Sequence, residues 1–94
     1  MKIRWVLWHT QFVEKIERKH SLTVEEVEDV LYGGMRVRRL ERGKIRDEDL
    51  YLGLGRSSAG RYISVFFVLK AGGVAMPISA RDMNRRERRM YGRG

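Results

Sequence analysis

Arginine gives this sequence of 94 residues most of its capacity for chemistry. Lysine and arginine together number 20 against 12 aspartates and glutamates, so the formal net charge is +8. An arginine fork grips two phosphate oxygens at once and keeps its charge. Arg56 and Arg61 flank a predicted hairpin and Arg81 ends a predicted strand, so neighbouring strands would bring all three together. We predict a phosphate-binding cradle there; the alternative is that these arginines are solvated or paired with carboxylates.

Residues able to transfer protons would be needed as well if such a cradle served catalysis. Acid–base cleavage of a phosphodiester needs a base for the attacking group, positive charge at the phosphoryl oxygens and an acid for the leaving oxygen. Glu87 and Tyr91 lie four residues apart and so share one face of a predicted helix. Glu87 also stands three residues after Asn84, where a capping glutamate belongs, and the Tyr91 ring could simply pack on a sheet.

His20 is another candidate acid or base, because histidine can serve in either role near neutral pH. Lys19 beside it could donate positive charge to RNA. The alternative is structural, since His20 follows Ile16 by four residues and could cap or half-bury the end of a helix.

The carboxy-terminal segment carries a further cluster of positive charge. It comprises Arg85, Arg86, Arg88 and Arg89. These side chains could follow an RNA backbone or meet an acidic protein surface, because both partners require the same electrostatics. The sequence does not choose between them.

We expect no metal site and no cofactor. The acidic residues Glu25, Glu26, Glu28 and Asp29 crowd one predicted helix and are read as its solvated face. No set of histidine, aspartate and glutamate has the spacing of metal ligands.

The first half of the sequence predicts a strand followed by two helices. The strand covers residues 3–9, and the polar step Thr10–Gln11 could cap a helix over residues 11–20. Thr23 and Glu26 form a capping-box pattern that begins a second helix. That helix stops near Tyr32, where Gly33–Gly34 supplies a residue able to adopt the left-handed conformation.

The second half predicts an antiparallel meander and a short terminal helix. The strands cover residues 35–40, 50–56, 61–70 and 74–80, with a charged and mobile loop over residues 41–49. Apolar residues of the first of these strands point inward, and residues 65–69 suit a central strand covered on both faces. Pro77 indicates an edge or a bulge. The helix over residues 84–92 starts at Asn84 or, alternatively, with Ser79 and Asp82 as its capping pair.

Length and composition favour one α+β domain over residues 1–94. The chain has no cysteine, as a reducing cytosol permits, and its longest apolar runs are far shorter than the roughly 20 residues of a membrane span. With no secretory signal visible, we expect a cytoplasmic protein. Its charge favours nucleic acid as partner, then an acidic protein; no membrane partner is expected.

Three strings in the sequence resemble those of the BrnT family of ribonuclease toxins, which has a RelE-like fold. Residues 18–27, RKHSLTVEEV, are similar to its "KHG-hydrophobic-S/T-x-E-E" segment. Residues 50–61, LYLGLGRSSAGR, are similar to its "G-R-S-x-x-G-R" hairpin. Residues 78–81 and 85–91, ISAR and RRERRMY, are similar to its terminus. The family's amino-terminal "W-D-x-x-K" pattern is replaced here by Trp5-Val6 and Trp8-His9, and Pro77 stands where an aliphatic residue is usual.

The resemblance implies a toxin that cleaves mRNA without metal and arrests growth. It also implies neutralisation by a ribbon-helix-helix antitoxin of the BrnA type, with operator DNA bound only through the toxin–antitoxin complex. The predicted catalytic residues are Arg56, Arg61, Arg81, Glu87 and Tyr91, with Lys19 and His20 close by. The rival hypothesis is a module of the same fold that binds nucleic acid or antitoxin for transcriptional autoregulation and does not catalyse.

Overall fold

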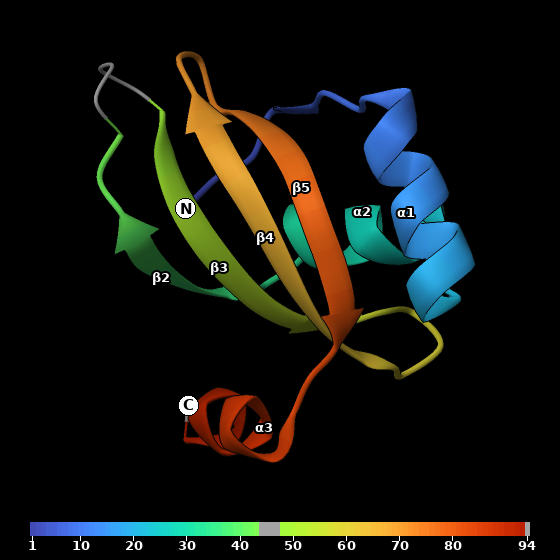
Figure 1. Cartoon of the computed structure of the whole chain (residues 1–94). Coiled ribbons are helices and arrows are strands. Elements are labelled where there is room, and N and C mark those ends of the chain that lie inside the picture. Colours follow the sequence, from blue (N-terminus) through green and yellow to red (C-terminus); the bar gives the residue numbers. More distant parts are fainter. Residues whose placement is uncertain (44–47, 94) are drawn as a thin grey trace.

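The computed structural model describes residues 1–43 and 48–93. Its elements follow the order strand, two helices, four strands and a helix (Figure 1). They are β1 (Trp5–Val6), α1 (Thr10–His20), α2 (Val24–Tyr32), β2 (Arg36–Glu41), β3 (Asp49–Arg56), β4 (Tyr62–Lys70), β5 (Val74–Asp82) and α3 (Arg85–Gly92). This confirms the expected α+β class and the order of elements.

The strands form one five-stranded sheet in the order β1-β5-β4-β3-β2. β2 to β5 make the predicted antiparallel meander, and β1 pairs with β5 in parallel. β4 lies at the centre, as its apolar run predicts. Its alternate residues point to opposite faces of the sheet, so every cross-strand partner can be assigned to a face.

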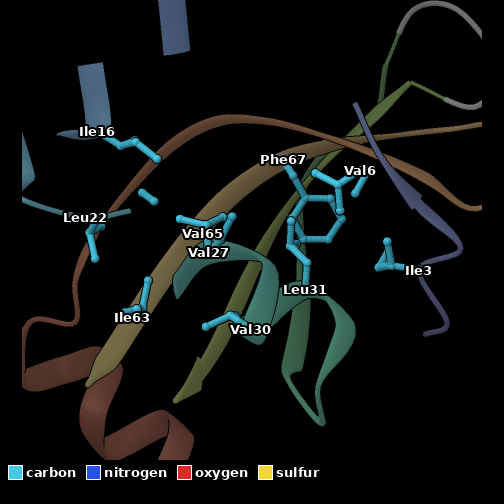
Figure 2. Close-up of a cluster of buried hydrophobic side chains, with 12 residues drawn as sticks. Ile3, Val6, Ile16, Leu22, Val27, Val30, Leu31, Ile63, Val65 and Phe67 are labelled. Carbon is cyan, nitrogen blue, oxygen red and sulfur yellow. The ribbon is translucent and has the colours of Figure 1, made fainter. Parts of the chain in front are cut away.

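The main core lies between the sheet and the helices α1 and α2 (Figure 2). Ile63, Val65 and Phe67 point from β4 into this layer and are fully buried. Each helix buries one apolar stripe against them, as amphipathic helices do. The helical side contributes Ile16, Leu22, Val27, Val30 and Leu31.

The opposite face of the sheet is only partly covered. α3 packs over one end of it, where Leu52, Leu54 and Met83 are buried. Figure 1 shows α3 well apart from α1 and α2. Phe66 and Val68, which point to this face, are half-buried, so the prediction that residues 65–69 are covered on both faces is wrong for this side. We call this side the open face.

The amino-terminal strand is much shorter than the predicted residues 3–9. β1 pairs only at Trp5 and Val6, opposite Val74 and Ala75 of β5. The first helix agrees with prediction to within one residue, but its cap is different. His9 occupies the N-cap position without a side-chain hydrogen bond, and Thr10 is already helical.

The second helix starts as predicted and ends for a different reason. Thr23 and Glu26 form the complete capping box. Gly33 is extended (φ −88°), so the expected left-handed conformation is absent there. A Cβ on Gly33 would lie 2.6 Å from the Asp29 carbonyl oxygen. Close approach to the helix is therefore what requires glycine.

Two bulges alter the predicted alternation of the strands. One lies between Arg39 and Glu41, and it leaves Leu40 exposed although an inward position was expected. The other lies in β5, where Phe66 pairs with Ser79 and Phe67 pairs with Pro77. The bulge at Pro77 is thus confirmed.

Of the predicted mobile loop over residues 41–49, residues 44–47 lie outside the described part of the chain.

Gly55 marks a close contact between β3 and α2, because a Cβ there would lie 2.9 Å from Cγ1 of Val30. We expect Gly55→Ala to lower the free energy of unfolding by about 1–3 kcal/mol through overpacking. Urea denaturation measures this change. The control is Gly34→Ala, because that Cβ would meet nothing within 4 Å. An equal loss in both variants would contradict the contact as the cause.

Ser21 adopts a left-handed conformation (φ 52°) at the end of α1. Side chains other than glycine pay about 1–2 kcal/mol for this conformation. Glycine would relieve the strain but lose about 0.5–1 kcal/mol through the entropy of the unfolded chain. We therefore expect Ser21→Gly to raise the free energy of unfolding by about 0.5–1 kcal/mol. Ser58→Gly should give no such gain, because φ at Ser58 is not positive. A matching gain there would refute the explanation.

Candidate active site on the open face

Arg81 and Glu87 form the centre of the site. Arg81 pairs with Ser64 of β4 in the sheet and so points to the open face. Its guanidinium donates to both carboxylate oxygens of Glu87, from Nη1 at 2.6 Å and from Nη2 at 2.7 Å. This two-pronged geometry fixes the arginine plane as well as its position.

The bulge in β5 decides which face Arg81 occupies. Side chains alternate along a strand, so one extra residue reverses every later side chain. Pro77 and Ala80 pair with the buried Phe67 and Val65 and point to the helical layer. Ile78 is the additional residue between them; if the strand alternated regularly through Ile78 with no bulge, Arg81 would point into that layer too.

Glu87 is almost completely buried, with 6% of its surface exposed. It also accepts hydrogen bonds from the Ser64 hydroxyl at 2.9 Å and from the Asn84 backbone N–H at 2.9 Å. Burial alone would raise its pKa, but the bonds from Arg81, Asn84 and Ser64 outweigh burial and hold the pKa below its usual value. Glu87 is therefore an ionised carboxylate that positions Arg81. The capping box of Asn84 and Glu87 is confirmed, and the alternative helix start at Ser79 is wrong.

Arg81 retains free hydrogen-bonding capacity. A guanidinium has five N–H groups. Within the described residues, one Nη1–H and one Nη2–H bind Glu87, and Nη1 also donates to the Asp82 carbonyl oxygen at 3.3 Å. Nε–H and the second Nη2–H remain, and the side chain is 34% exposed. Such an edge can bind two oxygens of one phosphate.

Tyr62 gathers two more arginines on the same face. The Arg88 guanidinium lies 3.8 Å from the centre of its ring and that of Arg56 lies 4.7 Å away. The Tyr91 ring meets the Tyr62 ring edge-on at 6.0 Å. Cation–π contacts of this kind order the two arginines without consuming their N–H donors. Tyr91 is half-buried, and its ring packs against the cluster of Leu52, Leu54 and Met83.

Arg61 lies apart from these residues, so the expected convergence of three arginines is wrong in this part. Its guanidinium donates to both oxygens of Asp82 at 2.7 and 3.0 Å and to the carbonyl oxygens of His20 and Ser21. Asp82 pairs with Ile63, which points to the helical layer. The reason is strand alternation, which sends neighbouring residues to opposite faces.

The hydrogen bonds of Arg61 to His20, Ser21 and Asp82 link the turn between α1 and α2 to the end of β5. The hydrogen bond from Arg61 holds the pKa of Asp82 below its usual value against the opposing effect of burial. His20 ends α1 and is half-exposed, while Lys19 is exposed. The structure thus places Lys19 and His20 on the helical side of the sheet.

The remaining arginines of α3 are exposed. Arg85, Arg86 and Arg89 make no side-chain hydrogen bond or ion pair within residues 1–43 and 48–93. Sequence reasoning missed Ser64 and Tyr62; a signal for Ser64 was available, because it is a hydroxyl inside an apolar run. In the described part of the chain, no three His, Asp or Glu side chains lie close enough to hold a metal ion.

The comparison with known families decides what kind of protein carries this site. A family model described as "Ribonuclease toxin, BrnT, of type II toxin-antitoxin system" matches residues 8–87. The chain belongs to the BrnT family. No curated protein matches it. The family implies an RNA substrate and an antitoxin protein as partner.

The match to the BrnT family includes most of the proposed site. Arg56, Arg81 and Glu87 lie within it, whereas Arg88 and Tyr91 lie beyond its last residue. No helix in residues 1–43 or 48–93 of this BrnT-family chain has the length and apolar character needed to cross a membrane.

Because of Glu87, the free energy of unfolding of this BrnT-family protein should fall as the pH is lowered. The folded-state pKa of Glu87 lies below the usual 4.5, so its contribution is complete above that pH and is lost as pH falls through the folded value. We expect Glu87→Gln to cost about 1–3 kcal/mol at pH 7. The difference from the unmodified chain should shrink on acidification to about pH 3.

Denaturation at several pH values measures this difference. The control is Glu17→Gln, an exposed glutamate on α1. A Glu87→Gln deficit that stayed constant from pH 7 to acid would show that shape, and not ionisation, is responsible.

Proposed function

We propose that this chain is a metal-independent endoribonuclease toxin that cleaves mRNA by attack of the 2′-hydroxyl. The observation that supports this most is the orientation of Arg81 by the buried Glu87 carboxylate, with one N–H edge left over on the open face. A preorganised donor pair of this kind stabilises charge that develops on phosphoryl oxygens.

In the proposed reaction the 2′-oxygen forms a bond to phosphorus while the bond from phosphorus to the 5′-oxygen breaks. The products are a 2′,3′-cyclic phosphate and a 5′-hydroxyl. Arg81 binds the non-bridging oxygens, and Arg56 and Arg88, ordered on Tyr62, add positive charge. Tyr91 is the proposed donor of a proton to the 5′-oxygen, while the proton of the 2′-hydroxyl passes to solvent water.

Glu87 and Arg61 act in this proposal as positioning residues. The Glu87 carboxylate is ionised, but its oxygens already accept hydrogen bonds from Arg81, Ser64 and Asn84, so it is not assigned as the base. Arg61 holds the α1–α2 turn and Asp82 on the other side of the sheet. Lys19 and His20 lie on that side as well and take no part in the proposed chemistry.

The antitoxin is proposed to be a small ribbon-helix-helix protein that binds the toxin in the cytoplasm. The type II description of the family supports a protein antitoxin. The resemblance of the three sequence strings supports the ribbon-helix-helix type, and operator DNA would then be bound only through the complex. The exposed arginines of α3 suit an acidic surface on that partner as well as RNA.

Removal of the arginine fork tests the proposed cleavage. We expect Arg81→Lys to slow cleavage of a model mRNA by about 100-fold or more, because lysine keeps the charge but loses the paired donors. Arg81→Ala should abolish both cleavage and the growth arrest caused by induced expression. Activity of the unmodified chain should persist with EDTA.

The control is Arg18→Ala, an exposed arginine on α1 that should cleave normally. Circular dichroism and thermal melting verify that each variant is folded. Full cleavage by a folded Arg81→Ala variant would contradict the proposed site. If the unmodified chain binds RNA but never cleaves it, the non-catalytic binding module becomes the better explanation.

A further inference from the structure

A hollow lined almost entirely by arginine lies between α3 and the edge strand β2. Its volume is about 270 Å³. The lining side chains are Arg38 of β2 together with Arg86, Arg89, Met90 and Arg93 of the carboxy-terminal segment. The α3 members are three or four residues apart, so they share one flank of the helix. The opposite flank carries Arg88, which lies on Tyr62.

None of the four arginines has a carboxylate partner within the described residues. All four are exposed, and none makes a side-chain hydrogen bond or an ion pair there. Arg39, next to Arg38 but on the other face of the sheet, does pair with Asp49 at 3.6 Å. Four guanidinium groups in one hollow repel one another, so the hollow favours an anion that binds several of them.

The hollow lies on the same face of the sheet as Arg81, and one row of paired residues, with the buried Leu52 at its middle, relates the two. Arg38 pairs with Leu52, and Leu52 pairs with Phe66. The Arg81 guanidinium lies over the Phe66 ring, with its central carbon 5.3 Å from the ring centre. Arg81 therefore marks one end of the row and Arg38 the other.

The length of this row exceeds one nucleotide step. Phe66 of β4, which lies under the Arg81 guanidinium, is two strand spacings from Arg38 of β2, which is about 10 Å. A single-stranded RNA whose scissile phosphate sits at Arg81 could thus carry another phosphate to the hollow.

We propose that the hollow of Arg38, Arg86, Arg89 and Arg93 is a second phosphate-binding subsite for the RNA backbone, away from the cleaved bond. This inference rests on the proposed function, because it takes Arg81 as the site of the scissile phosphate. It assigns a binding role to Arg38 and Arg93. The subsite lengthens the RNA that the toxin grips without contributing to the chemical step.

An acidic segment of a protein partner fits the hollow less well. A protein interface usually has an apolar centre surrounded by polar residues. Met90 is the single apolar side chain in this lining, and it is half-buried because it packs against the cluster of Leu52, Leu54 and Met83. The position of the hollow on the same face of the sheet as Arg81 favours RNA as well.

The test measures binding of 2′-O-methyl RNA, which lacks the attacking hydroxyl and cannot be cleaved. The variant Arg38→Gln/Arg93→Gln is compared with Lys15→Gln/Arg18→Gln, which removes the same charge from exposed positions on α1. We expect the first variant to bind an eight-nucleotide strand about tenfold more weakly at low salt. Its plot of log K against log salt should be shallower by about 1.4, because each phosphate contact on a single strand contributes about 0.7.

A dinucleotide, too short to reach from Arg81 to the hollow, should bind both variants and the unmodified chain equally. Equal losses in the two variants, or an unchanged salt slope, would overturn the subsite. Unchanged RNA binding with weakened antitoxin binding would overturn it in favour of the protein partner. Because this RNA is never cleaved, the binding result is independent of the cleavage experiment. Full cleavage by a folded Arg81→Ala variant would refute the proposed function, whereas the binding measurements test the subsite.

Discussion

The buried carboxylate of Glu87 is the interaction on which the open face depends. It completes the capping box that starts α3, accepts the Ser64 hydroxyl from the central strand, and holds both prongs of Arg81 from β5. A charge removed from water is tolerated only when it is paired and hydrogen-bonded. Helix start, helix docking and arginine orientation are consequently one arrangement, and disturbing any of them disturbs the other two.

Much of the fold could be predicted because its signals are local. The capping boxes at Thr23 and Asn84 and the apolar run of β4 all act over a few residues, and all appear in the structure. The length of β1 could not be predicted in this way. It is set by the two residues of β5 that it pairs with, which lie far away in the chain.

The site was predicted less completely, and the reason is again geometric. Arg81 and Glu87 belong to one short stretch, and their bond follows from the helix cap that the sequence indicates. The separation of Arg61 from Arg81 depends on the face that each residue takes, and the bulge after Pro77 reverses the faces of β5. Sequence reasoning expected an edge or a bulge there but did not follow its effect on Arg81. Ser64 was missed because a hydroxyl in an apolar strand acquires its role only from a distant carboxylate.

Within the described part of the chain β2 is the last strand of the sheet, so the backbone donors and acceptors along its outer side have no neighbouring strand there. An unpaired edge strand of this kind can pair with a strand of a second molecule. Repeated pairing between molecules would then produce an aggregate. Here β2 carries Arg36, Arg38 and Arg39, all exposed, and a bulge interrupts its regular spacing. Two such edges would bring like charges together. The arginines that suit a polyanion therefore also keep copies of this toxin from aggregating through their sheets.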